Sequence, residues 1–446
     1  MTRQDGAMQP DSTPPGDGGA TGPRPGRPRL TRRQALGLGG GAALAGGSAL
    51  TLGLAHARGG GEDAAGSVVA FHGTRQAGVT TARQSHALLA LYDLQVSRRD
   101  ELVGLLRAVT ARARLLTAGA LERPTSQGDP PPDSGTLGAG GDPQGLTITL
   151  GVGGGPFERP GDPFGIAERR PRALKPMPSF PGDDLDPAQT DADLLLQICA
   201  EDPLVAMHAL RDVERHVRGA LTPRVVNRGS QRRIPVRRAR GEVADARGLL
   251  GFKDGTANPS TGDGELLRRL VWLDGSDAGE PAWTRDGTYL VLRKIRERLE
   301  AWDRETLQSQ ERIIGRRRDS GAPLDGRREA DEPAFADQEG ERTPLDSHVR
   351  RANPRLPGSE GQRILRRSYP YFDGYDQAGL LDAGLLFICF QRDPVAQFEA
   401  VKQRLSPAAA RPQSLDEYLT CVGGGYFFCP HGATGEDRFV GDRLFA

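Results

Sequence analysis

Two stretches far apart in the chain share one pattern of apolar and polar residues. Residues 193–203 read DLLLQICAEDP, and residues 385–394 read LLFICFQRDP. In each stretch a continuous apolar run is typical of a strand buried in a sheet. The run is followed by residues whose apolar members recur at helical spacing, which is typical of a helix with one face on a core. The recurrence predicts that the chain contains a duplicated strand–helix unit.

Further predicted elements surround the two repeats in a similar order. They are helices over 82–117 and 203–217 and a strand over 146–150 in the first half, and a strand over 288–292 and helices over 295–308 and 395–405 in the second. Apolar residues form the core faces of the two repeated helices, namely Leu204, Met207, Leu210 and Val213 in the first and Phe398, Val401 and Leu405 in the second. This order predicts an α+β fold of duplicated ferredoxin-like domains, with antiparallel sheets flanked by helices.

The N-terminal region predicts export of the protein. Residues 1–31 are rich in Pro, Gly and Arg and are too polar to form a core. The pair Arg32-Arg33 directly precedes an uncharged run over 35–55, an order typical of a twin-arginine signal peptide. Cleavage after Ala57 would then release the mature chain. An uncleaved membrane anchor is the alternative, because the run is about long enough to cross a bilayer.

The distribution of charged residues indicates a domain boundary and excludes one class of partner. An arginine-rich stretch over 224–247 separates the two halves. We therefore expect three parts, namely a disordered region with the signal peptide over 1–57, an N-terminal ferredoxin-like domain over 58–222 and a C-terminal ferredoxin-like domain over 223–446. The formal net charge is +1, and basic and acidic residues are interspersed. No nucleic-acid partner is expected, because such partners require a concentrated basic surface.

The four cysteines do not make a disulfide scaffold in a chain of 446 residues. Cys199 and Cys389 lie in the two apolar runs and are expected to be buried thiols. Cys421 and Cys429 could form a disulfide after export. An extended strand between them would hold the two sulfur atoms too far apart.

Three short segments carry the most distinctive side-chain chemistry. Residues 251–259 read GFKDGTANP, residues 346–350 read DSHVR and residues 365–369 read LRRSY. Each also has a structural interpretation. Asp254 precedes a glycine, as in a hairpin turn, and the residues before His348 are of the type that caps a helix.

Two further ambiguities concern the arginines and the remaining histidines. Arg366 and Arg367 would ordinarily be surface charges, and one of them is expected to be so. His72 and His86 are rivals of His348 as metal ligands, because the other histidines fall in the signal peptide, on an amphipathic helix or in a terminal loop.

In combination the motifs resemble the dye-decolourising peroxidase family, and within it the exported bacterial members of the iron-uptake-operon or deferrochelatase group. The resemblance covers almost the whole mature chain, over 70–78, 251–259, 302–304, 314–316, 320–324, 346–355, 366–371 and 423–428. One departure is Arg75, where the family usually has histidine.

The resemblance implies one haem b per chain, bound in the C-terminal half. It makes His348 the proximal ligand of the haem iron, Asp254 the distal acid–base group and Arg366 the distal cation, with a possible contact to a haem propionate. Three further residues are expected beside the haem, namely Gly255, Thr256 and Ser368. Glu360 and Asp393 are both candidates to bind the second nitrogen of the proximal histidine.

The function that the resemblance implies is a haem-dependent peroxidase, which reduces hydrogen peroxide and oxidises bulky phenolic or dye-like electron donors. Such donors would exchange electrons through surface aromatic residues, for which the candidates are Tyr369, Tyr371, Tyr375, Tyr426, Trp272, Trp283 and Trp302. Most of these side chains are expected to be core packing instead. The twin-arginine translocation machinery would export the protein to the cell envelope or the medium, or to the periplasm of a Gram-negative source. One alternative is a haem-handling protein that releases iron, and another is an exported binding module without redox chemistry.

Overall fold

The computed structural model describes residues 68–446 except 123–125, 129, 139–140, 233–234, 239–240, 245, 336, 338 and 407–413. The predicted signal peptide and its cleavage site lie outside the described residues. Those residues belong to one unit that extends from Gly61 to Ala446.

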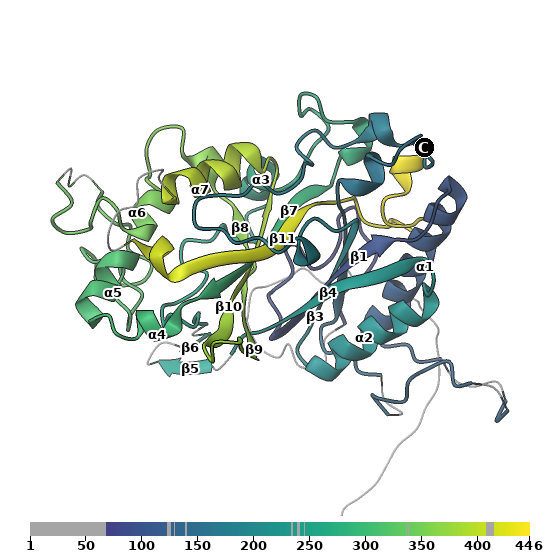
Figure 1. Cartoon of the computed structure of the whole chain (residues 1–446), viewed down its shortest axis with the longest axis horizontal. Helices are drawn as coiled ribbons and strands as arrows, with labels where there is room; N and C mark the ends of the chain where they lie inside the picture. The colour runs from purple at the N-terminus through teal and green to yellow at the C-terminus, as the bar shows by residue number, and fades with distance from the viewer. Residues whose placement is uncertain are drawn as a thin grey trace, which may run out of the picture. The chain divides into compact units, whose positions relative to one another are not determined.

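The first half folds as one ferredoxin-like unit. Its elements are β1 (His86–Leu94), α1 (Arg99–Thr117), β2 (Thr147–Val152), β3 (Leu194–Ala200), α2 (Pro203–His216) and β4 (Leu221–Ser230). The strands pair antiparallel in the order β4-β1-β3-β2. Helices α1 and α2 lie next to each other along these strands (Figure 1). The β-α-β-β-α-β order is that of the ferredoxin-like motif.

The second half repeats this topology with more insertions. Its strands are β7 (Thr288–Glu297), β8 (Leu365–Arg366), β9 (Tyr369–Tyr375), β10 (Leu381–Gln391) and β11 (Leu419–Cys429). Its helices are α3 (Gly264–Leu270), α4 (Leu299–Trp302), α5 (Leu307–Ile314), α6 (His348–Ala352) and α7 (Ala400–Leu405), the last preceded by a π-helical turn, Val395–Glu399. A small hairpin, β5 (Pro235–Arg238) and β6 (Gly241–Ala244), lies between the halves in sequence.

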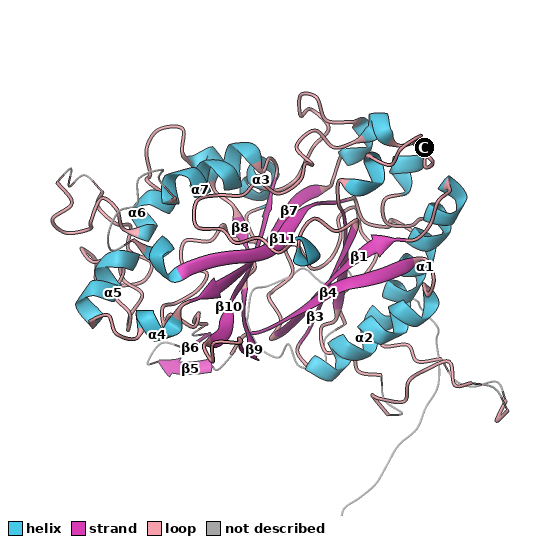
Figure 2. Ribbon diagram, in the orientation of Figure 1, coloured by secondary structure: helices cyan, strands magenta, loops and turns pink. Residues whose placement is uncertain are grey.

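One sheet runs through both halves. The second-half strands are ordered β11-β7-β10-β8, with β9 also paired to β10. Phe428 of β11 pairs with Val152 of β2, so the two four-strand orders join edge to edge (Figure 2). The predicted α+β, duplicated ferredoxin-like fold is confirmed. The predicted domain boundary at 222/223 stays a prediction.

Two predicted helices are wrong in part. The stretch 82–117 contains strand β1 before helix α1, because residues 86–94 pair with both β3 and β4 and are buried between them. The stretch 295–308 begins as the end of β7, and helix α5 continues beyond it. In the duplication, β7 therefore corresponds to β1 and not to β2. Local helix propensity is overridden here by pairing with distant strands.

The predicted core face of α2 is also wrong in part. Leu204 and Met207 are 56% and 52% exposed, whereas Val205, Ala209 and Val213 are buried. The buried stripe thus follows the i, i+4 spacing from Val205. In the second repeat Phe398 and Val401 are buried as expected.

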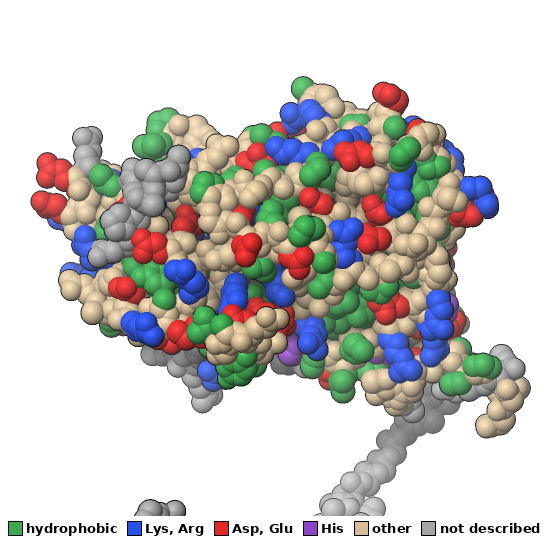
Figure 3. Space-filling view, in the orientation of Figure 1, with side chains coloured by type: hydrophobic (Ala, Val, Ile, Leu, Met, Phe, Trp, Pro, Cys, Tyr) green, Lys and Arg blue, Asp and Glu red, His purple; other side chains and the backbone are tan. Residues whose placement is uncertain are grey.

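All four cysteines are free and buried. Cys421 and Cys429 both lie in β11, and the extended strand keeps them from forming a disulfide. On the face drawn in Figure 3, acidic and basic side chains are interspersed, as the sequence indicated. Within the part of the chain that the structure describes, no helix is long and apolar enough to cross a membrane.

Candidate functional site

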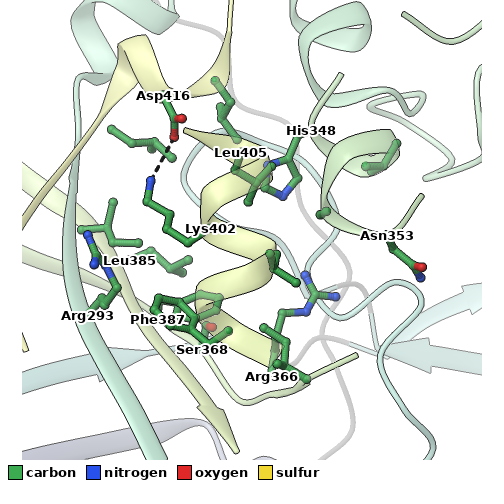
Figure 4. Close-up of a pocket in the computed structure, with 18 of the residues that line it drawn as sticks. Arg293, His348, Asn353, Arg366, Ser368, Leu385, Phe387, Lys402, Leu405 and Asp416 are labelled. Carbon is green, nitrogen blue, oxygen red and sulfur yellow. Dashed lines mark hydrogen bonds and ion pairs between the residues drawn. The ribbon is translucent and has the colours of Figure 1, made fainter. Parts of the chain in front are cut away.

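A cavity lies in the second half, where the sheet faces helices α6 and α7 (Figure 4). Its volume is about 290 Å³, near the lower end of the range of about 300–1,000 Å³ that is usual for small-molecule pockets. Its walls are largely apolar, with contributions from Ile295, Ile364, Leu385, Phe387, Phe398, Val401, Leu405, Leu415 and Leu419.

His348 enters the cavity from the first turn of α6. The preceding Ser347 does not cap this helix through its side chain, since its hydroxyl donates to the carbonyl of Pro344 at 2.7 Å. Burial, with a smaller effect from the positive charge of Arg366, lowers the pKa of His348 to about 4. The ring is therefore neutral at neutral pH, which is the form that binds a metal.

The carboxylate whose charge acts on His348 is Asp416, which the sequence did not indicate. Asp416 follows α7 and is held by Lys402 at 3.3 Å (Figure 4). The Ser406 hydroxyl also donates to its carboxylate at 2.8 Å. Neither of the expected partners lines the cavity. Asp393 pairs with Arg172 at 2.7 Å, and Glu360 is exposed.

Asp254 lines the cavity from the loop over 251–259. The tight turn of the hairpin lies before Asp254, between Gly248 and Gly251, and Gly251 has a φ of +85°. Asp254 is therefore not part of this hairpin turn, which was the structural interpretation of the residue. Its carboxylate accepts a hydrogen bond from Arg83 at 2.5 Å, and Arg83 also donates to the carbonyl of Ser368 at 2.7 Å.

Arg366 lines the same cavity from β8. Its backbone N–H donates to the Asn258 side chain at 2.9 Å, and its carbonyl accepts from the same side chain at 2.9 Å. The guanidinium donates to the carbonyl of Thr256 at 2.8 Å. These contacts fasten the Asp254 loop to β8, so the two charged groups are held by one framework.

Arg367 is not the surface charge that the sequence suggested. Its side chain is 4% exposed and donates to the carbonyls of Thr81 at 2.5 Å and Ala82 at 3.3 Å and to Gln84. One arginine of the pair therefore serves the cavity, and the other anchors the segment before β1.

Only some of the other residues expected beside the haem line the cavity. Thr256 and Ser368 line the cavity, whereas Gly255 does not. Gly255 has a φ of +91°, a conformation that favours glycine and sets the turn after Asp254. The rival histidines lie elsewhere, with His72 3.7 Å from Glu436 and His86 at the start of β1.

Several charged residues of the cavity were not among those expected from the sequence. Two of them, Arg293 and Glu297, could have been found from the alternation of side chains along a strand. Arg293, Ile295 and Glu297 alternate along β7 and all line the cavity. The residues between them point away, with Lys294 bound to Asp373 and Arg296 to Asp376. No local pattern in the sequence indicates Arg83, because its partner Asp254 lies in the other half of the chain.

Two family descriptions match the chain. "Dyp-type peroxidase, N-terminal" matches residues 76–231, and "Dyp-type peroxidase, C-terminal" matches residues 245–434. The chain belongs to the Dyp-type peroxidase family. It is accordingly a haem-dependent peroxidase, which reduces hydrogen peroxide at the expense of an electron donor.

Similar proteins include a deferrochelatase of Escherichia coli K12, which is 40% identical over 378 residues, or 84% of this chain and 86% of the relative. Among solved structures, ferric DtpA from Streptomyces lividans is 35% identical with a TM-score of 0.75, covering 85% of this chain and 98% of that one. A DyP-type peroxidase from Cellulomonas bogoriensis is 34% identical with a TM-score of 0.73, covering 86% and 99%.

Proposed function

We propose that this peroxidase binds one haem b in the cavity of its second half, where His348 would hold the iron and Asp254 and Arg366 would act on peroxide. The observation that carries the proposal is a neutral histidine in the same apolar-walled cavity as an aspartate and an arginine.

The residues of the cavity fit such a group. Apolar side chains provide walls for a flat macrocycle, and His348 is held neutral. Two buried nitrogens of Arg293, Nε and Nη1, have no hydrogen-bond partner among the described residues. A guanidinium in that state suits a carboxylate of the ligand, as a propionate would supply.

Haem, when bound, supplies the iron that receives peroxide and the electrons that reduce it. The carboxylate of Asp254 would take the proton that peroxide loses and return it to the departing oxygen. Arg366 cannot exchange a proton, because its guanidinium stays charged, and it would stabilise the negative charge that develops on peroxide. Arg83 would hold the Asp254 carboxylate in place. Asp416 would orient His348 from its side of the cavity.

Bulky phenolic or dye-like donors would transfer electrons at the surface. Among the seven aromatic candidates Tyr375 is 69% exposed, whereas Tyr369, Tyr371, Tyr426, Trp272, Trp283 and Trp302 are buried. Tyr375 packs edge-on against the exposed Phe372, with ring centroids 6.2 Å apart. We therefore assign surface donor oxidation to the β9 edge near Tyr375.

A second function, haem handling with release of iron, is favoured by the similarity to a deferrochelatase of Escherichia coli. An absorption spectrum of the purified protein before and after one equivalent of hydrogen peroxide tests the first function. A haem band that changes with peroxide supports it, and a haem band that does not respond contradicts it. Iron release from bound haem, measured with a chelator in the same preparation, tests the second.

We also propose export through the twin-arginine route. The basis is the Arg32-Arg33 pair and the uncharged run that follows it. Replacing both arginines by lysine should retain the protein in the cytoplasm, as measured by cell fractionation. Unchanged export would contradict this route.

A further inference from the structure

Glu297 is one of four carboxyl residues that line the cavity, with Asp183, Asp254 and Asp416. It is the last residue of β7, its side chain lies on the cavity side of the strand, and it is 4% exposed. Its Oε2 atom is buried and has no hydrogen-bond partner among the described residues. A buried carboxylate in this state is costly unless it carries a proton.

Asp254 and Glu297 differ in their partners. Asp254 forms an ion pair with Arg83 at 2.5 Å. For Glu297 the described part of the chain contains no paired lysine or arginine, and Asp254 is the one charged group that acts on it. Burial, followed by the negative charge of Asp254, raises the pKa of Glu297 to about 8. At neutral pH Asp254 is thus held in an ion pair, whereas Glu297 is mostly protonated.

We propose that Glu297 is the proton-donating partner of Asp254 in the peroxidase reaction. Two titratable groups whose surroundings differ in this way mark an acid and a base in many enzymes. This inference rests on the proposed haem site, and it divides between two residues a role that Asp254 would otherwise perform alone.

The proposed exchange is balanced. The Asp254 carboxylate takes the proton that hydrogen peroxide releases on binding. The Glu297 carboxyl would protonate the departing oxygen, which would leave as water when the O–O bond breaks heterolytically, and the bound haem would supply the two electrons. The proton on Asp254 then passes to the Glu297 carboxylate, directly or through water, and no net proton is consumed.

The first test measures the protonation state of Glu297 without any turnover. Infrared spectra of the full-length protein, with and without haem, are recorded from about pH 6 to 10, a range above the ordinary pKa of glutamate. We expect the carbonyl stretch of a protonated carboxyl group to disappear as the pH rises through about 8. The band should be absent from Glu297→Gln and unchanged in Glu341→Gln, which alters an exposed carboxyl. Absence of the band from the wild type would overturn the proposal.

A coupling measurement excludes a different buried carboxyl as the source of the band. Because the charge of Asp254 raises the pKa of Glu297, Asp254→Asn should move the loss of the band to lower pH. An unmoved band would show that the titrating group does not face Asp254 and would also overturn the proposal.

The second test uses the haem-loaded protein and stopped-flow mixing with hydrogen peroxide. Glu297→Gln should bind haem normally, react at least about tenfold more slowly and lose the decline in rate near pH 8, as for removal of a general acid. A rate and pH profile equal to those of wild type would reject Glu297 as the donor. If the wild type itself binds no haem or does not react, the proposed function fails, and the infrared result still reports the state of Glu297.

Discussion

Arg83 and Asp254 form an ion pair, 2.5 Å apart, between the segment before β1 and the cavity of the second half. Arg83 belongs to the first ferredoxin-like half, yet it contacts the residue expected to exchange protons with peroxide. Both side chains are largely buried, with 21% and 16% exposed. The first half thus contributes directly to the site.

Arg83→Leu should therefore slow the reaction with hydrogen peroxide while leaving haem bound. Without its partner, Asp254 loses a fixed orientation, and misplacement of a reacting group costs roughly ten- to a hundredfold in rate. Stopped-flow absorption measures this rate. Arg83→Lys should recover part of it, and Arg269→Leu, at an exposed arginine, should have no effect. An Arg83→Leu rate equal to that of wild type would show that Asp254 does not depend on this pair.

His348→Ala should give a folded protein that does not retain haem. The cavity contains His348, whereas His72 and His86 lie outside it. Absorption spectra after gel filtration measure the bound haem, and His72→Ala and His86→Ala serve as matched controls. Loss of haem from either control, with retention by His348→Ala, would reassign the ligand.

Arg366→Leu and Arg367→Leu should fail in different ways. The first should keep haem and react with peroxide about a hundredfold more slowly or worse, as expected for loss of a fixed positive charge. The second removes buried hydrogen bonds to the segment before β1, and it should lower the free energy of unfolding by about 1–3 kcal/mol for each polar group left without a partner. Stopped-flow kinetics and thermal unfolding separate the two effects. If the two variants had the same reaction rates and the same stability, the assignment of Arg366 to catalysis and of Arg367 to stability would be wrong.

Asp254→Asn should retain haem and slow the reaction with peroxide, because an amide of similar size cannot accept the proton. Rates are compared with those of wild type across roughly pH 4 to 7, which brackets the ordinary pKa of aspartate. Should the variant keep both the rate and the pH profile, Asp254 has only a structural role and Arg366 acts without it.

Glu297 should make the haem-free protein less stable as the pH rises. Its pKa is raised from 4.5 to about 8 in the folded state, so its favourable contribution is complete below about pH 4.5 and is lost as the pH rises toward 8. The loss is on the order of a few kcal/mol, at 1.36 kcal/mol for each unit of pKa. Denaturant unfolding from pH 5 to 9 should therefore show a steeper decline for wild type than for Glu297→Gln. Parallel curves would mean that Glu297 is not buried as a neutral acid.

Much of the duplicated fold and the principal chemical residues could be predicted from local sequence. The apolar runs of β3 and β10 and the amphipathic residues after them carry their own periodicity, so both repeats were recognised. His348, Asp254 and Arg366 stand in short motifs whose order is sufficient to indicate the family. These signals are contained within a few neighbouring residues, and the sequence alone determines them.

Tertiary structure decided what depends on contacts between distant residues. β1 is a strand because β3 and β4 flank it, although its Ala- and Leu-rich sequence is compatible with a helix. Arg367 is buried by the segment before β1, and Glu297 shares a cavity with Asp254 only because β7 ends there. The state of a charged side chain is set by the surfaces that fold over it, and no local pattern in the chain encodes which surfaces those are.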